Sequence, residues 1–191
     1  MRAVIRLRSS INANREVKET LQHLRLNKVN HCVLMPEGKT FDGMLQKVKD
    51  YVTWGELKPE VLTNMLIKRG RLTGNRKLDN KYVKDNSEFP SMVKYAEAII
   101  SGKANYSDMK DVQPVFRLHP PLKGHAGIKK SFKVGGDLGY RGDDINELIL
   151  KMLGPKQELK TVTEKKDEKK AAPKKKAPAK KPAAKKKEAK K

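Results

Sequence analysis

The sequence predicts an α+β protein whose first part is a small β-α-β-α-β unit. Apolar residues in the first 57 positions switch between a period of two, typical of a strand, and spacings of three and four, typical of a helix. The first strand shows the period of two, since Ala3, Ile5 and Leu7 fall on one side while arginines fall on the other. Alternating strands and helices favour a small sheet with both helices packed on one face.

The first helix follows a turn that is rich in capping residues. Its apolar stripe is formed by Val17, Leu21 and Leu24, at spacings of four and three. Asn12 or Asn14 is expected to open this helix, because asparagine side chains accept hydrogen bonds from the free amides of a first turn.

Two strands and a second helix complete the unit. The apolar run at 32–35 predicts a buried strand that ends at Pro36, since proline lacks the amide that a sheet requires. A second helical stripe occupies 41–48. A third strand is expected at 51–54, where Gly55 stops it.

The composition changes twice more along the chain. Three further helices, bracketed by Pro, Asp or Gly near their ends, are expected at 59–69, 90–100 and 145–152. Asp143 or Asp144 is expected to cap the last of them. Beyond Pro155, large apolar residues are too few to offset the entropy of ordering, which predicts disorder in the free protein. The predicted parts are a core at 1–57, an extension of helices and loops at 58–155, and a Lys/Ala/Pro-rich tail at 156–191.

The charge of the chain predicts a polyanionic partner. The formal net charge is +22 at pH 7, from 44 Lys and Arg against 22 Asp and Glu. The tail supplies only half of this positive charge. Residues 156–191 contain 16 lysines and five acids, a net charge of +11, and residues 1–155 contain 28 basic and 17 acidic side chains, again +11. The body of the protein is therefore expected to be basic in its own right.

The sequence contains no pattern typical of catalysis or metal binding, so no enzyme activity, cofactor or metal is expected. GHAGIKKS, at 124–131, lacks the glycine before the last lysine and the leading strand of a phosphate-binding loop. None of the four histidines forms an i, i+4 pair on a helix, and Cys32 is the only cysteine. Charges interrupt the N-terminal apolar residues, and no 18 apolar residues run together. A cytoplasmic protein without a signal peptide or membrane span is expected.

Two basic, glycine-rich segments, 68–77 and 117–141, are the predicted contacts with RNA. Arginine offers a planar fork to phosphates, glycine permits close backbone approach, and each neutralised phosphate releases counterions. The second segment is expected to be extended, to add nothing to a core and to fold fully only against RNA. Tyr140, His119 or His125 is expected to stack on an unpaired base. The candidate RNA-binding residues are Lys68, Arg69, Arg71, Arg76, Lys77, Arg117, His119, Lys123, His125, Lys129, Lys130, Lys133, Tyr140 and Arg141.

Ordered motifs across residues 1–155 resemble those of a known family. They are RLNKVNHCVLMP, GMLQKVKDYVTWGE, LIKRGRLTGNRKL, PVFRLHPP and GGDLGYRGDDINELILKML. On these motifs the chain resembles the longer, archaeal-type members of the L-thirty family of large-subunit ribosomal proteins, named L-seven in eukaryotes. Short bacterial-type members correspond only to residues 1–57, and the Lys/Ala/Pro-rich tail departs from the family pattern.

The resemblance implies an antiparallel three-stranded sheet, related to ferredoxin-like folds, and a structural role without catalysis. It further implies binding to large-subunit rRNA near 5S rRNA, contacts with other large-subunit proteins, and participation in rRNA maturation during subunit assembly. A position in the cytoplasm, in the ribosome, follows from this role. Neither a membrane nor a homo-oligomer is expected.

Three alternative functions compete with this one. A DNA-condensing, nucleoid-type protein is the strongest, because the tail resembles that of a linker histone; removal of 156–191 would then abolish condensation but would still allow a ribosomal protein to enter its subunit. An enzyme with an unrecognised site predicts turnover that alanine at His119 or Arg141 abolishes. Membrane-surface binding is the weakest, because the tail lacks an apolar face that would insert.

Overall fold

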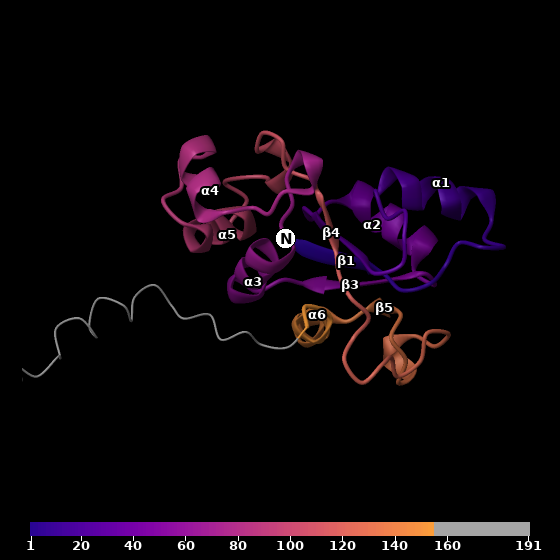
Figure 1. Cartoon of the computed structure of the whole chain (residues 1–191). Helices are drawn as coiled ribbons and strands as arrows, with labels where there is room; N and C mark the ends of the chain where they lie inside the picture. Colours follow the sequence, from indigo (N-terminus) through magenta and orange to yellow (C-terminus); the bar gives the residue numbers. More distant parts are fainter. Residues whose placement is uncertain (155–191) are drawn as a thin grey trace, which may run out of the picture. The chain divides into compact units, whose positions relative to one another are not determined.

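A five-stranded sheet of order β4-β2-β1-β3-β5 forms the centre of the protein (Figure 1). The computed structural model describes residues 1–154, and the predicted disorder of 156–191 lies outside these residues. The strands are β1 Arg2–Arg6, β2 His31–Met35, β3 Val52–Glu56, β4 Val115–Arg117 and β5 Gly139–Tyr140. The α-helices are α1 Arg15–His23, α2 Lys39–Val48, α3 Pro59–Arg69, α4 Asn80–Asn86, α5 Met92–Ile100 and α6 Ile145–Met152. The predicted α+β class is confirmed.

The three predicted strands form the middle of the sheet. β1 pairs antiparallel with both β2 and β3, as the family resemblance implies. β4 adds antiparallel to β2, and β5 adds parallel to β3. The predicted number of three strands is therefore wrong. The two added strands have only three and two residues, too few for a period of two to appear in the sequence.

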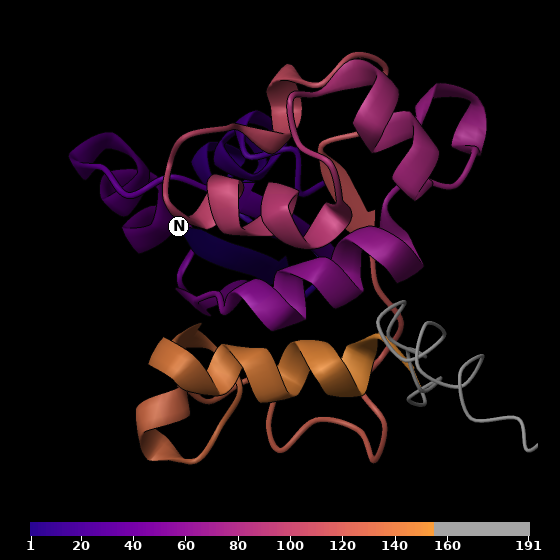
Figure 2. The same cartoon turned by 90° about the vertical axis from the view of Figure 1, so that its left-hand side faces the viewer.

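Two hydrophobic clusters cover the two faces of the sheet. Ala3 and Ile5 of β1 point into a cluster shared with α3, α5 and α6. Val4, between them, points to the opposite side, into a cluster shared with α1 and α2. Figure 2 shows α5, α3 and α6 one below another across the first face. The expectation that the first two helices share one face is confirmed.

The expected helix starts are mostly correct in position. α3 spans Pro59–Arg69 as expected, and α1 and α6 begin directly after Asn14 and Asp144. The expected capping by these two side chains is wrong, because neither side chain makes a capping hydrogen bond to its helix. α5 begins two residues later than expected because the Ser91 hydroxyl caps it. α4 lies where the sequence predicts no helix, since Val83 is its one buried residue and an apolar stripe does not form.

The expectation that 117–141 adds nothing to a core is wrong. Leu118 and Leu138, near its two ends, are buried. Phe116, directly before the segment, is fully buried and stacks on Tyr106 with ring centroids 4.8 Å apart. The segment packs because β4 and β5 attach its ends to opposite edges of the sheet, a pairing that local sequence patterns do not reveal.

Candidate nucleic-acid interface

Residues 117–141, here named the basic arm, are attached to the sheet at both ends. At the start of the arm, β4 pairs with β2. At its end, the Thr53 hydroxyl donates a hydrogen bond to the Gly139 carbonyl at 3.0 Å, and the Arg141 amide donates to the Trp54 carbonyl at 2.9 Å. The arm is therefore a long loop whose two ends are fixed on a folded support.

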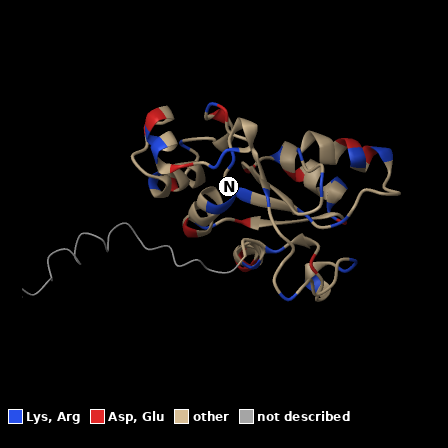
Figure 3. Ribbon diagram, in the orientation of Figure 1, with Lys and Arg blue, Asp and Glu red and all other residues tan. Residues whose placement is uncertain are grey.

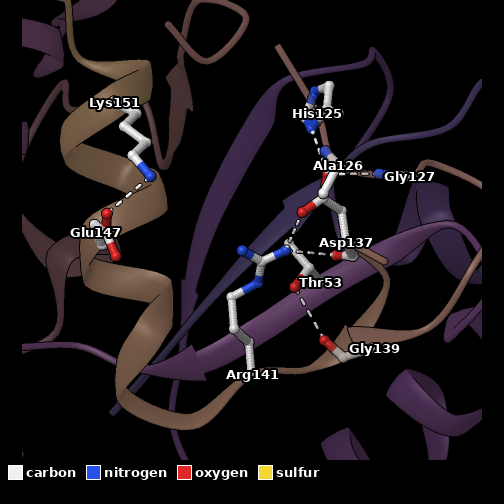
Figure 4. Close-up of polar contacts among 9 residues, drawn as sticks. All are labelled: Thr53, His125, Ala126, Gly127, Asp137, Gly139, Arg141, Glu147 and Lys151. Atoms are coloured by element: carbon white, nitrogen blue, oxygen red, sulfur yellow. Dashed lines mark hydrogen bonds and ion pairs between the residues drawn. The ribbon is translucent and has the colours of Figure 1, made fainter. Parts of the chain in front are cut away.

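Asp137 organises the interior of the arm (Figure 4). Its carboxylate accepts from Arg141 Nη2 at 2.6 Å on one oxygen, and lies 3.2 Å from His125 Nδ1 and 2.8 Å from the donating Ala126 amide on the other. Burial alone would raise the pKa of Asp137, but the hydrogen bond and charge of Arg141 and the amides of Gly127 and Ala126 outweigh it and lower that pKa. The anion thus joins segments of the arm that are ten or more residues apart.

Two of the predicted RNA contacts lie inside this network. The Arg141 side chain is 9% exposed, and its guanidinium carbon lies 4.6 Å from the centroid of the Phe132 ring. The His125 side chain is 14% exposed and faces Asp137. Tyr140, by contrast, is half exposed, and its hydroxyl donates to both carboxylate oxygens of Glu56 at 2.9 Å.

The other polar candidates of the arm are exposed to solvent. These residues are Arg117, His119, Lys123, Lys129, Lys130 and Lys133. Figure 3 shows basic positions on the outer turns of the arm, where acidic positions are few. Because these basic side chains are exposed and Asp137, the one acid of the arm, is buried, the outer surface of the arm is cationic.

The first predicted loop, 68–77, is a tight turn at the end of α3. Arg71 and Lys77 form an antiparallel bridge across it, and Gly74 at its tip has a φ of 78°, which glycine adopts without strain. Arg76 and Lys77 are exposed, whereas Lys68, Arg69 and Arg71 are partly buried. Burial and the nearby charge of Arg71 lower the pKa of Arg69.

The structure does not bring the two predicted segments into one patch. The first loop adjoins the residues that lead into β4, since Leu72 bridges to Val112 and the Gln113 amide donates to the Arg71 carbonyl at 2.9 Å. The cationic turns of the arm continue toward β5, at the opposite edge of the sheet. The candidates therefore form two basic surfaces.

Positive charge also gathers where the arm begins. His31 of β2 is the register partner of Arg117 of β4. Burial, and then the charges of Arg117, Lys28 and Arg6, lower the pKa of His31. The sequence does not reveal this cationic surrounding, because Arg6 and Arg117 are 111 positions apart in the chain.

Three residues that were not among the predicted contacts lie at one cleft beside the arm. Lys49, Trp54 and Phe132, of which only Phe132 belongs to the arm, line this cleft together with Tyr140 and two arm lysines. Their proximity depends on the pairing of β3 with β5, which no local pattern predicts. Only the aromatic character of Trp54 and Phe132, in a chain with 5% aromatic residues, could have singled them out.

Within residues 1–154 the side chains do not form a centre for catalysis by a metal or thiol. No group of three or more His, Cys, Asp and Glu side chains there could hold a metal ion. Cys32 is buried, and burial raises the pKa of its thiol to about 12, so the nucleophilic thiolate is scarce. None of the helices in this part of the chain has the length and apolar character of a membrane span.

A basic α+β protein with exposed cations on loops that are attached to its sheet has the features typical of structural proteins that bind polyanions. Known proteins define its family. The family described as Ribosomal protein L30p/L7e matches residues 3–52. The chain is 49% identical over 152 residues to the "Large ribosomal subunit protein uL30" of Archaeoglobus fulgidus, a match that covers 80% of this chain and 99% of that one.

Further archaeal relatives agree with this assignment. Proteins of the same description from Methanothrix thermoacetophila and Methanocella arvoryzae are 50% and 46% identical over 152 residues, again 80% of this chain and 99% of theirs. The chain therefore belongs to the L30p/L7e family of ribosomal proteins. It is a structural protein of the ribosome in the cytoplasm, and it is not an enzyme.

Proposed function

We propose that this chain, a structural protein of the large ribosomal subunit like its archaeal relatives, binds large-subunit rRNA through two basic surfaces. One surface is the outer side of the basic arm, and the other is the tight loop that carries Arg76 and Lys77. The observation that carries the proposal is the placement of exposed cations on a loop whose ends are both fixed to the sheet.

The arm is suited to phosphates because its shape is set before RNA arrives. The ion pair of Asp137 with Arg141 holds the arm's interior, so exposed lysines need not be ordered from a free chain on binding. Phosphate position and helix shape then dominate recognition, since side chains cannot read the deep groove of an RNA duplex. In this proposal Arg141 and His125 shape the arm rather than contact phosphate.

The same role includes the finer contacts that the family resemblance implies. The protein lies near 5S rRNA, contacts other large-subunit proteins as a single copy, and assists rRNA maturation during assembly. The tail adds attraction that does not depend on RNA sequence and raises the association rate, because its 16 lysines act over a Debye length of about 10 Å. Residues 1–57 and 58–155 act as a core and as its RNA-binding extension.

The test neutralises the arm's four exposed lysines together. The variant carries Lys→Gln at Lys123, Lys129, Lys130 and Lys133, and binding to large-subunit rRNA is measured across a salt series. If each lysine neutralises one phosphate, the slope of log affinity against log salt falls by about 3 to 4. The control carries four exposed lysines outside both basic surfaces changed to Gln, at Lys39, Lys84, Lys94 and Lys103. Equal slopes for the two variants would refute the assignment of the arm.

A further inference from the structure

A cleft of about 450 Å³ lies between the basic arm on one side and β3 with the C-terminal end of α2 on the other. Its volume falls in the range of about 300 to 1,000 Å³ that small-molecule sites occupy. Three aromatic side chains, three lysines and one acid contribute to its lining: Trp54, Phe132, Tyr140, Lys49, Lys129, Lys133 and Asp50. Gln46 and Ser131 add neutral hydrogen-bonding groups.

The two largest rings meet because their strands are paired. Trp54 and Tyr140 are register partners in the parallel pair β3 and β5, so their side chains leave the same face of the sheet. Their centroids are 6.5 Å apart and the ring planes are inclined by 50°. Tyr140 is 49% exposed, and its hydroxyl is held by Glu56 at 2.9 Å, so about half of this residue remains accessible at the cleft.

Phe132 lies between this cleft and a second cleft, which is lined by residues of the arm and of α6. Phe132 lines both clefts, whereas Arg141, whose guanidinium lies over the Phe132 ring, lines only the second one. The network of Asp137 and Arg141 therefore supports the Phe132 side chain from behind, and the phenyl ring is positioned by groups that the first cleft itself does not expose.

The lining has the chemistry that recognises a nucleotide. Flat aromatic faces can stack on any of the four bases. Lys49, Lys129 and Lys133 supply positive charge for the phosphates and outnumber the one acid, Asp50. A continuous duplex presents its bases stacked and paired, so only a base that leaves the helix can reach such faces. An acidic peptide would satisfy the lysines but would leave the rings unused.

We propose that the cleft takes one unpaired nucleotide of rRNA, with its base against Trp54 and Tyr140 and its phosphates against the lysines. The inference rests on the proposed function, because it assigns a specific ligand to one end of the arm. Base stacking on aromatic side chains anchors the arm at one point, while the exposed cations along it supply contacts that do not depend on sequence.

Trp54 is the only tryptophan in the chain, so its fluorescence reports the cleft directly. The probes are two RNA duplexes of equal length, one with a single bulged adenosine and one fully paired. The full-length protein should bind the bulged duplex more tightly, and only this duplex should quench Trp54. Quenching of equal size by both duplexes would overturn the inference, since the cleft would then receive backbone and not a base.

Variants separate stacking from other roles of the same side chain. Tyr140→Leu should weaken binding of the bulged duplex by about 5- to 150-fold and leave binding of the paired duplex unchanged. Tyr140→Phe, which keeps the ring and loses the bond to Glu56, should retain the preference for the bulge. Tyr82→Leu, at a partly buried tyrosine of α4 outside the cleft, is the control and should leave binding of both duplexes unchanged.

The failure of this inference differs from the failure of the proposed function. If the protein binds both duplexes equally without a change in Trp54 fluorescence, the cleft is not a nucleotide site although the arm still binds RNA. If the four-lysine variant of the arm binds large-subunit rRNA with the affinity and salt slope of the unmodified protein, the proposed function fails and the inference falls with it.

Discussion

Replacing Asp137 by asparagine tests whether the buried anion holds the basic arm together. The carboxylate is 8% exposed and pairs with an Arg141 side chain that is 9% exposed, so the variant leaves a buried guanidinium without its counter-ion. Removing one partner of a buried pair costs ~3 to 5 kcal/mol. Because the asparagine oxygen can still accept from the Ala126 amide, we expect about 3 kcal/mol, near the lower end of that range.

The free energy of unfolding of the full chain, from urea titration, is the first measurement. Amide hydrogen exchange at Ala126, Gly127 and Leu138 is the second, because these amides are hydrogen-bonded within the arm and local opening would expose them without global unfolding. Asp85→Asn, at an exposed position of α4, is the control and should change stability by less than about 0.5 kcal/mol.

A double variant makes the reasoning refutable in a second way. Asp137→Asn combined with Arg141→Met removes both charges, so no uncompensated ion remains buried. This variant should be more stable than Asp137→Asn alone. If Asp137→Asn behaves like Asp85→Asn in stability and exchange, or if Arg141→Met worsens it, the ion pair does not organise the arm.

Three further predictions concern pH, backbone space and the buried thiol. Folding lowers the pKa of Asp137 from about 3.9, so the stability that its carboxylate contributes is complete above that pH and is lost as pH falls toward the folded pKa. The free energy of unfolding should therefore fall more steeply with acid in the unmodified protein than in Asp137→Asn. Gly136→Ala should destabilise the arm by about 1 to 3 kcal/mol, because the new Cβ would lie 2.1 Å from the Lys130 carbonyl oxygen. Gly43→Ala in α2 should stabilise the protein by about 0.5 to 1 kcal/mol, because its Cβ meets no atom within 4 Å. Urea titration of both variants measures these changes. Cys32 should react with a thiol reagent at pH 8 only as fast as the protein unfolds, since burial raises its pKa to about 12; rapid reaction of the native protein would contradict its placement.

Local sequence signals predict the parts of the fold that depend on local physics. The boundaries of α3 follow from Pro59 at its first position and Gly70 after its last. Proline needs no amide partner there, and a Cβ at position 70 would lie 2.4 Å from the Leu66 carbonyl oxygen. The three central strands follow from short apolar runs. β5 could not be predicted, since two residues acquire strand structure only by pairing with β3, 86 positions earlier in the chain.

The candidate site divides in the same way. Composition is enough to single out the basic arm as a candidate, because the net charge of a segment can be counted without knowledge of its contacts. Composition cannot distinguish Lys129, which is exposed, from Arg141, which forms a buried ion pair with an acid. That distinction requires the position of Asp137, and the cleft beside Trp54 requires the register of two strands.

The short outer strands have a consequence for the protein before it meets its ribosome. Long exposed edge strands template the addition of another chain, which leads to aggregation. Here the sheet ends in β4 and β5, of three and two residues, and each runs into the looped arm. The two short edges therefore offer little free backbone on which a second copy could extend the sheet.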